Sequence, residues 1–293
     1  MNILVTGSNG QLGSEIKVLS EQFSQHHYFF TDIEELDICD SIAVENYIYE
    51  NKINLIINCA AYTAVDKAEQ EPELAFKINA QAVENICVAA LKHAAFLIHI
   101  STDYVYDGKK DNPYLENNIT NPISVYGKSK LKGEEIIIAH KLPALILRTS
   151  WLYSSFGSNF VKTILGLLKE KSRVNIISDQ IGTPTYAADL AKIILDIITH
   201  EDLPTHPEIY HFSDDGITTW YEFALLIAEI MNSKTFIHPI STKEYPTPAT
   251  RPQFSLLSKE KIKHDFNIQI PFWQDSLKKC LAIIEENELA ENE

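Results

Sequence analysis

The sequence predicts an α/β fold, in which a doubly wound parallel sheet is followed by a smaller α/β lobe that would bind a substrate. Short apolar runs alternate with longer amphipathic stretches through the first half of the 293-residue chain, and the first run leads into closely spaced glycines. The second half is less regular and contains proline-rich loops. Because alternating strands and helices require right-handed crossovers, we expect a parallel sheet with helices on both faces.

Five apolar runs in the first half are typical of buried strands. They lie at residues 3–6, 28–31, 55–58, 96–101 and 145–148. Helical spacing of apolar residues is clearest at 72–93, and the second half has helical patterns near 160–171, 187–199 and 220–231.

These patterns predict a nucleotide-binding domain at residues 1–150 and a mainly substrate-binding lobe at residues 151–293. The helix near 187–199 is expected to pack back on the first domain. The segment YPTPATRP at 245–252 predicts a loop, and the acidic stretch 285–293 is expected to be frayed.

Charge and cysteine content argue against several classes of protein. Lys and Arg total 25 against 40 Asp and Glu, a formal net charge of −15, so we expect no nucleic-acid partner. No run of eighteen apolar residues predicts a membrane span, and the start MNILVTG shows no leader pattern. We therefore expect a cytoplasmic protein with no membrane partner, whose four scattered cysteines are reduced core thiols.

A glycine-rich loop follows the first predicted strand. Gly7, Gly10 and Gly13 form the pattern GxxGxxG between this strand and a helical stretch. In that order they would allow a tight turn, a close approach of the backbone to a pyrophosphate, and close packing of helix on strand. The start of the helix offers free N–H groups to phosphates. The loop therefore predicts a Rossmann-type site for NADPH or NADH.

Asp32 ends the second predicted strand, where an acidic residue would meet the ribose hydroxyls of the cofactor. An ordinary turn aspartate is an equally good interpretation. An acid at this position favours NADH over a phosphorylated cofactor, but the choice between NADH and NADPH stays open.

Three residues form a candidate catalytic group. Thr102 lies at the end of the fourth predicted strand, and Tyr126 and Lys130 form a YxxxK pattern at the start of a helical stretch. Residues four apart on a helix share a face, and an ammonium near a phenol is expected to lower the tyrosine pKa toward the working pH. A threonine hydroxyl at the same sheet edge could hydrogen-bond the same carbonyl oxygen. The group predicts carbonyl/alcohol chemistry.

Longer motifs surround these residues. They are TGSNGQLGSE, NCAAYTAVDKAEQEPELAFKINA, STDYVYDG, YGKSKLKGE, RTSWLY, SDQIGTPT and YPTPATRP. With them the chain resembles the extended short-chain dehydrogenase/reductase family, and within it the dTDP-4-dehydrorhamnose reductases. The resemblance implies the last step of dTDP-L-rhamnose synthesis, in which the 4-keto group of dTDP-4-dehydro-β-L-rhamnose takes hydride from NADPH or NADH.

The resemblance also implies roles for individual residues. Tyr126 would donate the proton, Lys130 would tune Tyr126 and hold the nicotinamide ribose, and Thr102 would polarise the keto oxygen. Asp103 would contact the sugar. The remaining implied cofactor contacts are Gly10, Gln11 and Leu12 at the pyrophosphate, Asp32 at the ribose, Asp37 and Ile38 at the adenine, and Ala61, Tyr62 and Thr63 after the third strand.

Two further residues are implied on the substrate side. Trp151 would pack against the deoxysugar because a flat apolar face matches the C–H face of a sugar, although a core tryptophan remains an alternative. Arg251 is a candidate partner for the diphosphate because a guanidinium binds phosphate oxygens bidentately. A solvated loop arginine is the alternative there.

Some family members form dimers through a metal held by acidic residues. Glu15 matches the first acidic position, but the second falls near Ala188, which cannot bind a metal, although Asp189 is adjacent. We therefore do not favour Mg²⁺, and we expect a monomer or a homodimer. The ten histidines show no HxH or HExxH spacing that would predict another metal site.

Two other functions stay open at this point. One is a nucleotide-sugar ketoreductase or epimerase that acts on a different sugar, and the other is a non-catalytic regulatory subunit of the same fold. The intact set of Thr102, Tyr126 and Lys130 argues against the regulatory subunit, because a binding module does not need all three.

Overall fold

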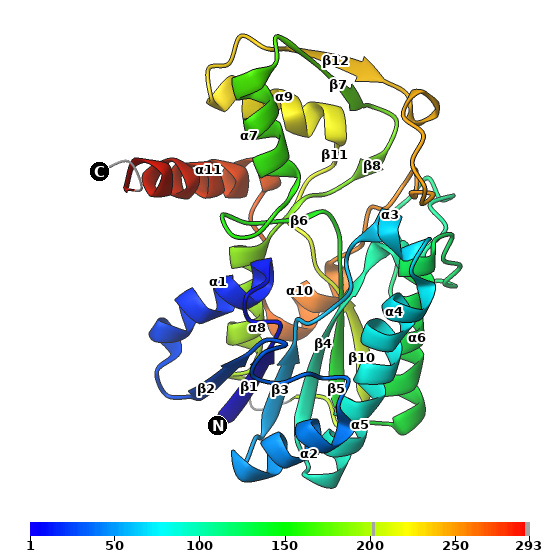
Figure 1. Cartoon of the computed structure of the whole chain (residues 1–293), viewed down its shortest axis with the longest axis vertical. Helices are drawn as coiled ribbons and strands as arrows, with labels where there is room; N and C mark the ends of the chain where they lie inside the picture. Colours follow the sequence, from blue (N-terminus) through cyan, green and yellow to red (C-terminus); the bar gives the residue numbers. More distant parts are fainter. Residues whose placement is uncertain (201–202, 291–293) are drawn as a thin grey trace.

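The computed structural model describes residues 1–200 and 203–290, and a six-stranded parallel sheet lies at its centre (Figure 1). The strand order is β10-β5-β4-β3-β1-β2, and every pairing is parallel. The strands are β1 (Asn2–Thr6), β2 (His27–Thr31), β3 (Leu55–Asn58), β4 (Phe96–Thr102), β5 (Ala144–Thr149) and β10 (Pro207–His211). The predicted Rossmann-type fold is confirmed, with all five predicted strands present.

The sixth strand, β10, was not predicted from the sequence. It begins with Pro207 and lacks a continuous apolar run. Proline has no N–H to donate, so it is tolerated at the start of a strand and at the edge of a sheet, and β10 forms the edge beside β5. The second half of the chain thus returns to complete the sheet.

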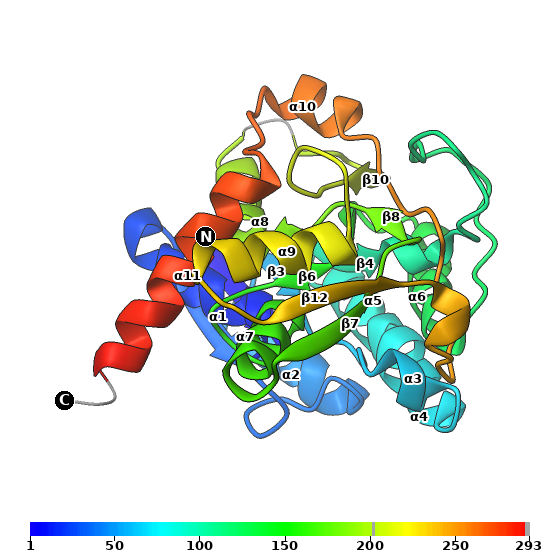
Figure 2. The ribbon, with the colours of Figure 1, turned by 90° about the horizontal axis from the view of Figure 1, so that it is seen from above.

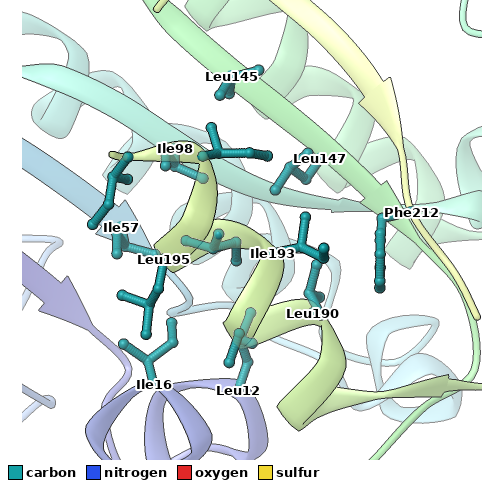
Figure 3. Packing of buried hydrophobic residues seen from close by; sticks show 14 of the residues in the cluster. Leu12, Ile16, Ile57, Ile98, Leu145, Leu147, Leu190, Ile193, Leu195 and Phe212 are labelled. Atoms are coloured by element: carbon teal, nitrogen blue, oxygen red, sulfur yellow. The ribbon is translucent and has the colours of Figure 1, made fainter. Parts of the chain in front are cut away.

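Helices cover both faces of the sheet. One face carries α1 (Gln11–Leu19), α8 (Ala187–Ile197) and α10 (Glu260–Phe266). The other carries α2 (Ser41–Glu50), α5 (Ala82–Lys92) and α6 (Val125–His140). Successive strand residues alternate between the faces, so Ile57 packs on the first and Ile56 on the second. Figure 3 shows the first core, where Ile16 and Leu195 meet the side chains of the strands.

The helical stretch predicted at 72–93 consists of three segments. They are α4 (Pro72–Phe76), the π-helical η2 (Lys77–Gln81) and α5. A short helix, α3 (Val65–Ala68), precedes them, and the 3₁₀ segments are η1 (Ser20–Phe23), η3 (Asp103–Val105) and η4 (Thr242–Glu244).

A second lobe stands above the carboxyl ends of the strands (Figures 1 and 2). Its helices are α7 (Phe160–Glu170), α9 (Trp220–Ile230) and α11 (Trp273–Ala290). Its strand pairs are β6 (Leu152–Tyr153) with β9 (Thr185–Tyr186), β7 (Arg173–Ile177) with β12 (Phe236–Ile240), and β8 (Ile181–Gly182) with β11 (Thr218–Thr219). The lobe has its own core, which includes Phe223, Trp273 and Leu277.

The division into residues 1–150 and 151–293 stays a proposal. In the structure α8, β10 and α10 of the second part pack on the first sheet. The expectation of a frayed end is wrong for 285–290, because α11 continues to Ala290, and 291–293 lie outside the described residues. Within the described part of the chain, no helix has the length and apolar composition of a membrane span.

Candidate active site

A cavity of about 990 Å³ opens at the carboxyl ends of the parallel strands, with walls from both lobes. Most of the predicted site residues line it, which are Gly7, Gly10, Gln11, Leu12, Gly13, Asp32, Asp37, Ile38, Ala61, Thr63, Thr102, Asp103, Tyr126, Lys130 and Trp151. Two predicted site residues, Tyr62 and Arg251, are outside the lining. The topology therefore brings groups from distant parts of the chain together at the carboxyl ends of the strands, as expected for an open parallel sheet.

The glycine loop packs too closely for larger residues at two of its positions. Gly7 has a φ of +65°, and a Cβ there would lie 2.7 Å from the Ala60 backbone. A Cβ on Gly13 would lie 2.4 Å from the Gly7 carbonyl oxygen. Gly10 precedes α1 and provides no side-chain cap, so the first N–H groups of this helix remain available at the cavity. This arrangement suits an anionic group such as a pyrophosphate.

Asp32 follows β2 and is tied to the glycine loop. Its carboxylate accepts hydrogen bonds from the Asn9 amide at 3.0 Å and the Ile33 amide at 2.9 Å. These backbone donors hold a negative charge at one end of the cavity, next to the cavity residues Asp37 and Ile38.

The segment after β3 is held by a residue that the sequence analysis did not single out. Asn79, in the π-helical η2, donates to the Tyr62 carbonyl at 3.0 Å and accepts from the Tyr62 amide at 2.8 Å. It also donates to the Ser129 hydroxyl on α6 at 2.9 Å. The Tyr62 hydroxyl donates to Glu71 at 2.6 Å. Tyr62 thus contributes a fixed backbone here, while Ala61 and Thr63 line the cavity.

The position at which helix α6 starts places Tyr126 beside β4. Ser124 caps the helix by accepting from the Gly127 amide at 3.1 Å. A Cβ on Gly127 would lie 2.2 Å from the Tyr104 carbonyl oxygen, so only glycine allows this close approach. The Tyr104 and Tyr126 rings then meet edge to face, 5.5 Å apart. The second residue of the YGKSK motif therefore has a structural reason to be glycine.

Lys130 lies one turn further along α6 and is 2% exposed. Its ammonium donates to the Ile100 carbonyl on β4 at 2.6 Å. Burial lowers the pKa of Lys130 to about 8, although the neighbouring Glu134 carboxylate favours the charged form. The ammonium is therefore anchored at the cavity wall.

The expectation of a lowered tyrosine pKa is wrong for this structure. Burial raises the pKa of Tyr126 to about 12, and it outweighs the hydrogen bond with Thr102, which favours the phenolate. The phenol is consequently protonated throughout the neutral range. This is the form that a proton donor needs.

Thr102 and Asp103 form a polar pair at the end of β4. The Thr102 hydroxyl donates to the Asp103 carboxylate at 3.0 Å and accepts from the Tyr104 amide at 3.2 Å. Asp103 is 2% exposed, and burial raises its pKa to about 6. One of its carboxylate oxygens has no hydrogen-bond partner among the described residues. That oxygen is itself buried, and the Ser255 hydroxyl favours the charged carboxylate. Both Thr102 and Asp103 line the cavity, so the pair lies at the position of a ligand.

A buried ion pair joins α6, the helix that carries Tyr126 and Lys130, to the sheet. Glu134 on α6 binds Arg148 on β5 through two nitrogens, with Nη2 to Oε2 at 2.5 Å, and it accepts a further hydrogen bond from Ser101. Arg148 also donates to the Tyr106 hydroxyl at 2.6 Å, and that hydroxyl contacts His211 on β10 at 2.9 Å. This network connects α6 to three strands of the sheet.

Trp151 is both a packed residue and part of the cavity wall. Its indole stacks on Trp220 with centroids 3.7 Å apart and an interplanar angle of 13°. The same residue lines the cavity just after β5. The two interpretations of Trp151 are therefore compatible, because the indole packs against Trp220 and Gly182 and still contributes surface to the cavity.

Arg251 is engaged in an ion pair between the lobes. Its guanidinium donates to Asp66 on α3 through both terminal nitrogens, at 3.1 and 2.7 Å. Asp66 also accepts from the Ala249 amide at 3.1 Å, so the loop at 245–252 is held against α3. A phosphate group that took the place of this carboxylate would meet both terminal nitrogens of Arg251.

Comparison with known proteins relates this site to one family. The family model described as "RmlD substrate binding domain" matches residues 1–286. The dTDP-4-dehydrorhamnose reductase of Aggregatibacter actinomycetemcomitans is 39% identical, with 97% of this chain and 99% of the relative covered. That of Escherichia coli strain K12 is also 39% identical, with 96% and 97% covered. The chain belongs to the dTDP-4-dehydrorhamnose reductase family.

Solved structures of the family superimpose closely on this chain. A dTDP-4-dehydrorhamnose reductase from Clostridium acetobutylicum has a TM-score of 0.93 and 39% identity, covering 97% of this chain and all of its own. One from Bacillus anthracis, solved with NADP, has a TM-score of 0.90 and 37% identity, covering 96% and 98%. A dTDP-glucose 4,6-dehydratase from Streptomyces venezuelae is only 16% identical, covers 98% of each chain with a TM-score of 0.83, and shares the fold alone.

The acidic residues considered for a metal in this reductase-family chain are engaged in other contacts. The Glu15 carboxylate accepts from the Ser154 hydroxyl at 2.6 Å, and the Asp189 carboxylate accepts from the Ser276 hydroxyl at 2.5 Å. Burial raises the pKa of both carboxyl groups. Within residues 1–200 and 203–290, no three acidic, histidine or cysteine side chains are grouped as a metal site requires.

Three supporting residues of the site were missed in the sequence, namely Asn79, Glu134 and Trp220. Asn79 lies 17 positions from its partner Tyr62, and Trp220 lies 69 positions from its partner Trp151. The position of Glu134, four residues after Lys130, was a usable signal, because residues four apart share a helix face. Asn79 and Trp220 had no comparable local signal.

Proposed function

We propose that this chain reduces the 4-keto group of dTDP-4-dehydro-β-L-rhamnose to dTDP-β-L-rhamnose with NADPH or NADH, as the last step of dTDP-L-rhamnose synthesis. The observation that carries the proposal is the meeting of Thr102, Tyr126 and Lys130 in one cavity with the glycine loop. Identity of 39% over nearly the whole length to reductases of this name supports the same reaction.

The residues present fit a nicotinamide cofactor. The uncapped start of α1 suits its pyrophosphate, and the carboxylate of Asp32 suits ribose hydroxyls. The adenine would lie by Asp37 and Ile38, and Ala61 and Thr63 would line the path toward the nicotinamide. When bound, the reduced cofactor supplies the hydride.

The catalytic residues then act on the oxygen of the keto group. We assign to Thr102 a hydrogen bond to this oxygen, and to the Tyr126 hydroxyl the transfer of a proton to it as negative charge develops. Lys130 would hold the nicotinamide ribose and place a positive charge near the phenolate that Tyr126 becomes. Its bond to the Ile100 carbonyl supports a fixed position for this charge.

Three residues are assigned to the substrate. Asp103, which lines the cavity, would accept a hydrogen bond from a sugar hydroxyl. Trp151 would pack against the apolar face of the deoxysugar. Arg251 would exchange Asp66 for the diphosphate.

The deciding experiment is oxidation of NADPH, and separately of NADH, with enzymatically generated dTDP-4-dehydrorhamnose. We expect one equivalent of reduced cofactor to be consumed for each dTDP-rhamnose formed, with the product identified by chromatography. The two rates give the cofactor preference. Product without consumption of cofactor would indicate an epimerase. Cofactor binding without turnover would favour a different nucleotide sugar or a regulatory subunit.

A further inference from the structure

Trp151 has a backbone conformation that large residues seldom adopt. Its φ is +48°, in the left-handed region, where a side chain larger than that of glycine is strained. Strain of this kind persists only where the surrounding structure enforces it, and it is concentrated at functional sites. Trp151 lies in the cavity wall, and neighbouring groups hold its indole in place there.

Two contacts hold the indole. Trp220 stacks on it at 3.7 Å between ring centroids. Gly182 lies over the opposite face of the indole, because a Cβ on Gly182 would come within 2.8 Å of Cε2 and Cζ2 of the ring. The Trp151 carbonyl accepts from the Thr185 amide at 3.2 Å, which fixes the backbone between these contacts.

Trp220 is itself placed firmly. It is the first residue of α9, and Thr219 and Glu222 form a capping box at this helix start. The preceding strand β11 pairs with β8, so the two supports of Trp151 are joined by backbone hydrogen bonds. Phe160 packs on the Trp220 ring with centroids 4.6 Å apart. Trp220 is absent from the cavity lining, so it acts behind Trp151 rather than on a ligand.

We propose that Trp220 is a positioning residue, which holds the Trp151 indole against the sugar of the bound nucleotide sugar and so contributes to recognition of the sugar rather than of the nucleotide. This inference rests on the proposed function. Because Trp220 reaches the substrate only through Trp151, its removal affects ligands that carry the sugar and spares those that do not.

The test compares two ligands by titration calorimetry, dTDP-L-rhamnose and dTDP, on folded variants of the full chain. For Trp220→Ala we expect about tenfold weaker binding of dTDP-L-rhamnose, with binding of dTDP and of the cofactor unchanged. Trp220→Phe keeps an aromatic ring and is expected to restore most of the affinity. In turnover, KM for the nucleotide sugar rises more than kcat falls.

Two further variants separate positioning from general damage. Tyr221→Ala removes a neighbouring aromatic of α9 and is expected to bind both ligands as the wild type does. Gly182→Ala places a methyl group against the indole from its other support and is expected to give the same sugar-selective loss. If Trp220→Ala does not fold, Gly182→Ala still tests the proposal.

Unchanged affinity for dTDP-L-rhamnose in Trp220→Ala and Gly182→Ala would overturn the inference, as would an equal loss of dTDP binding in these two variants. If the wild-type protein turns over dTDP-4-dehydrorhamnose but the variants show no sugar-selective loss of binding, only this inference is refuted. A wild-type protein that neither binds nor reduces the sugar nucleotide refutes the proposed function as well.

Discussion

At the scale of single residues, burial acts in opposite directions on the two ionisable groups of the YxxxK pair. It raises the pKa of Tyr126 to about 12 and lowers that of Lys130 to about 8. Both effects have the same cause, which is that a low-dielectric surrounding disfavours the charged form. Near neutral pH the tyrosine therefore holds its proton, and most of the lysine remains cationic.

Replacement of Tyr126 by phenylalanine removes the proposed proton donor and leaves the ring. We expect turnover in Tyr126→Phe to fall by about 10²–10⁴-fold. Cofactor binding is expected to persist, because the phenyl ring can keep its edge-to-face contact with Tyr104. Absorbance of NADPH measures the first effect and fluorescence titration the second. Wild-type turnover in this variant would rule out Tyr126 as the donor.

Activity is expected to depend on pH through Lys130. Since the pKa of this lysine is lowered to about 8, the ammonium is complete at lower pH and is lost as the pH rises through this value. Tyr126 does not titrate in that range, because its pKa is about 12. We therefore expect kcat/KM to decline above about pH 8. A profile that stays flat to about pH 9.5 would contradict this role for Lys130.

At the scale of elements, the position of α6 against the sheet depends on a buried ion pair. Glu134 and Arg148 are 1% and 2% exposed, and Arg148 reaches on to Tyr106. A buried pair of this kind is weak evidence for stability as such, but removal of one partner leaves an uncompensated charge. The pair therefore matters most for keeping α6 in register with β4 and β5.

Glu134→Ala is expected to lower the free energy of unfolding by about 3–5 kcal/mol, because Arg148 would stay buried without a counter-charge. Urea denaturation measures the change. Glu135→Ala is the matched control on the same helix, since Glu135 pairs with Lys132 at the exposed surface and should contribute less than about 0.5 kcal/mol. Equal effects of the two substitutions on the free energy of unfolding would show that burial of the Glu134–Arg148 pair does not make its loss more costly.

At the scale of the whole molecule, the two lobes are connected across the site. The loop at 245–252 meets α3 through Arg251 and Asp66, and the Arg251 guanidinium keeps the pKa of the Asp66 carboxyl below its usual value. The pair lies between the lobes whose residues together form the cavity wall. A change there can therefore affect both substrate binding and lobe contact.

Two substitutions distinguish these effects. If Arg251 exchanges Asp66 for the diphosphate, Arg251→Ala raises KM for the nucleotide sugar about tenfold, whereas Asp66→Asn leaves KM unchanged or lowers it. If the pair serves only to join the lobes, both substitutions have the same effect. Steady-state kinetics with the sugar nucleotide varied decides between these outcomes.

The sequence by itself determined the elements whose chemistry is local. Buried strands appear as apolar runs, the glycine loop as three spaced glycines, and the Tyr126–Lys130 face as a spacing of four. Each signal lies within a few residues, so no knowledge of the partner elements was needed. The doubly wound sheet and most of the cavity lining could therefore be predicted.

Only the tertiary structure decided the features that depend on distant residues. Strand β10 pairs with β5, Arg251 forms an ion pair with Asp66, and Trp220 stacks on Trp151. The direction of the Tyr126 pKa shift belongs here too, because it follows from how completely the fold removes water from the phenol. Burial is a property of the packed molecule, and no short stretch of sequence contains it.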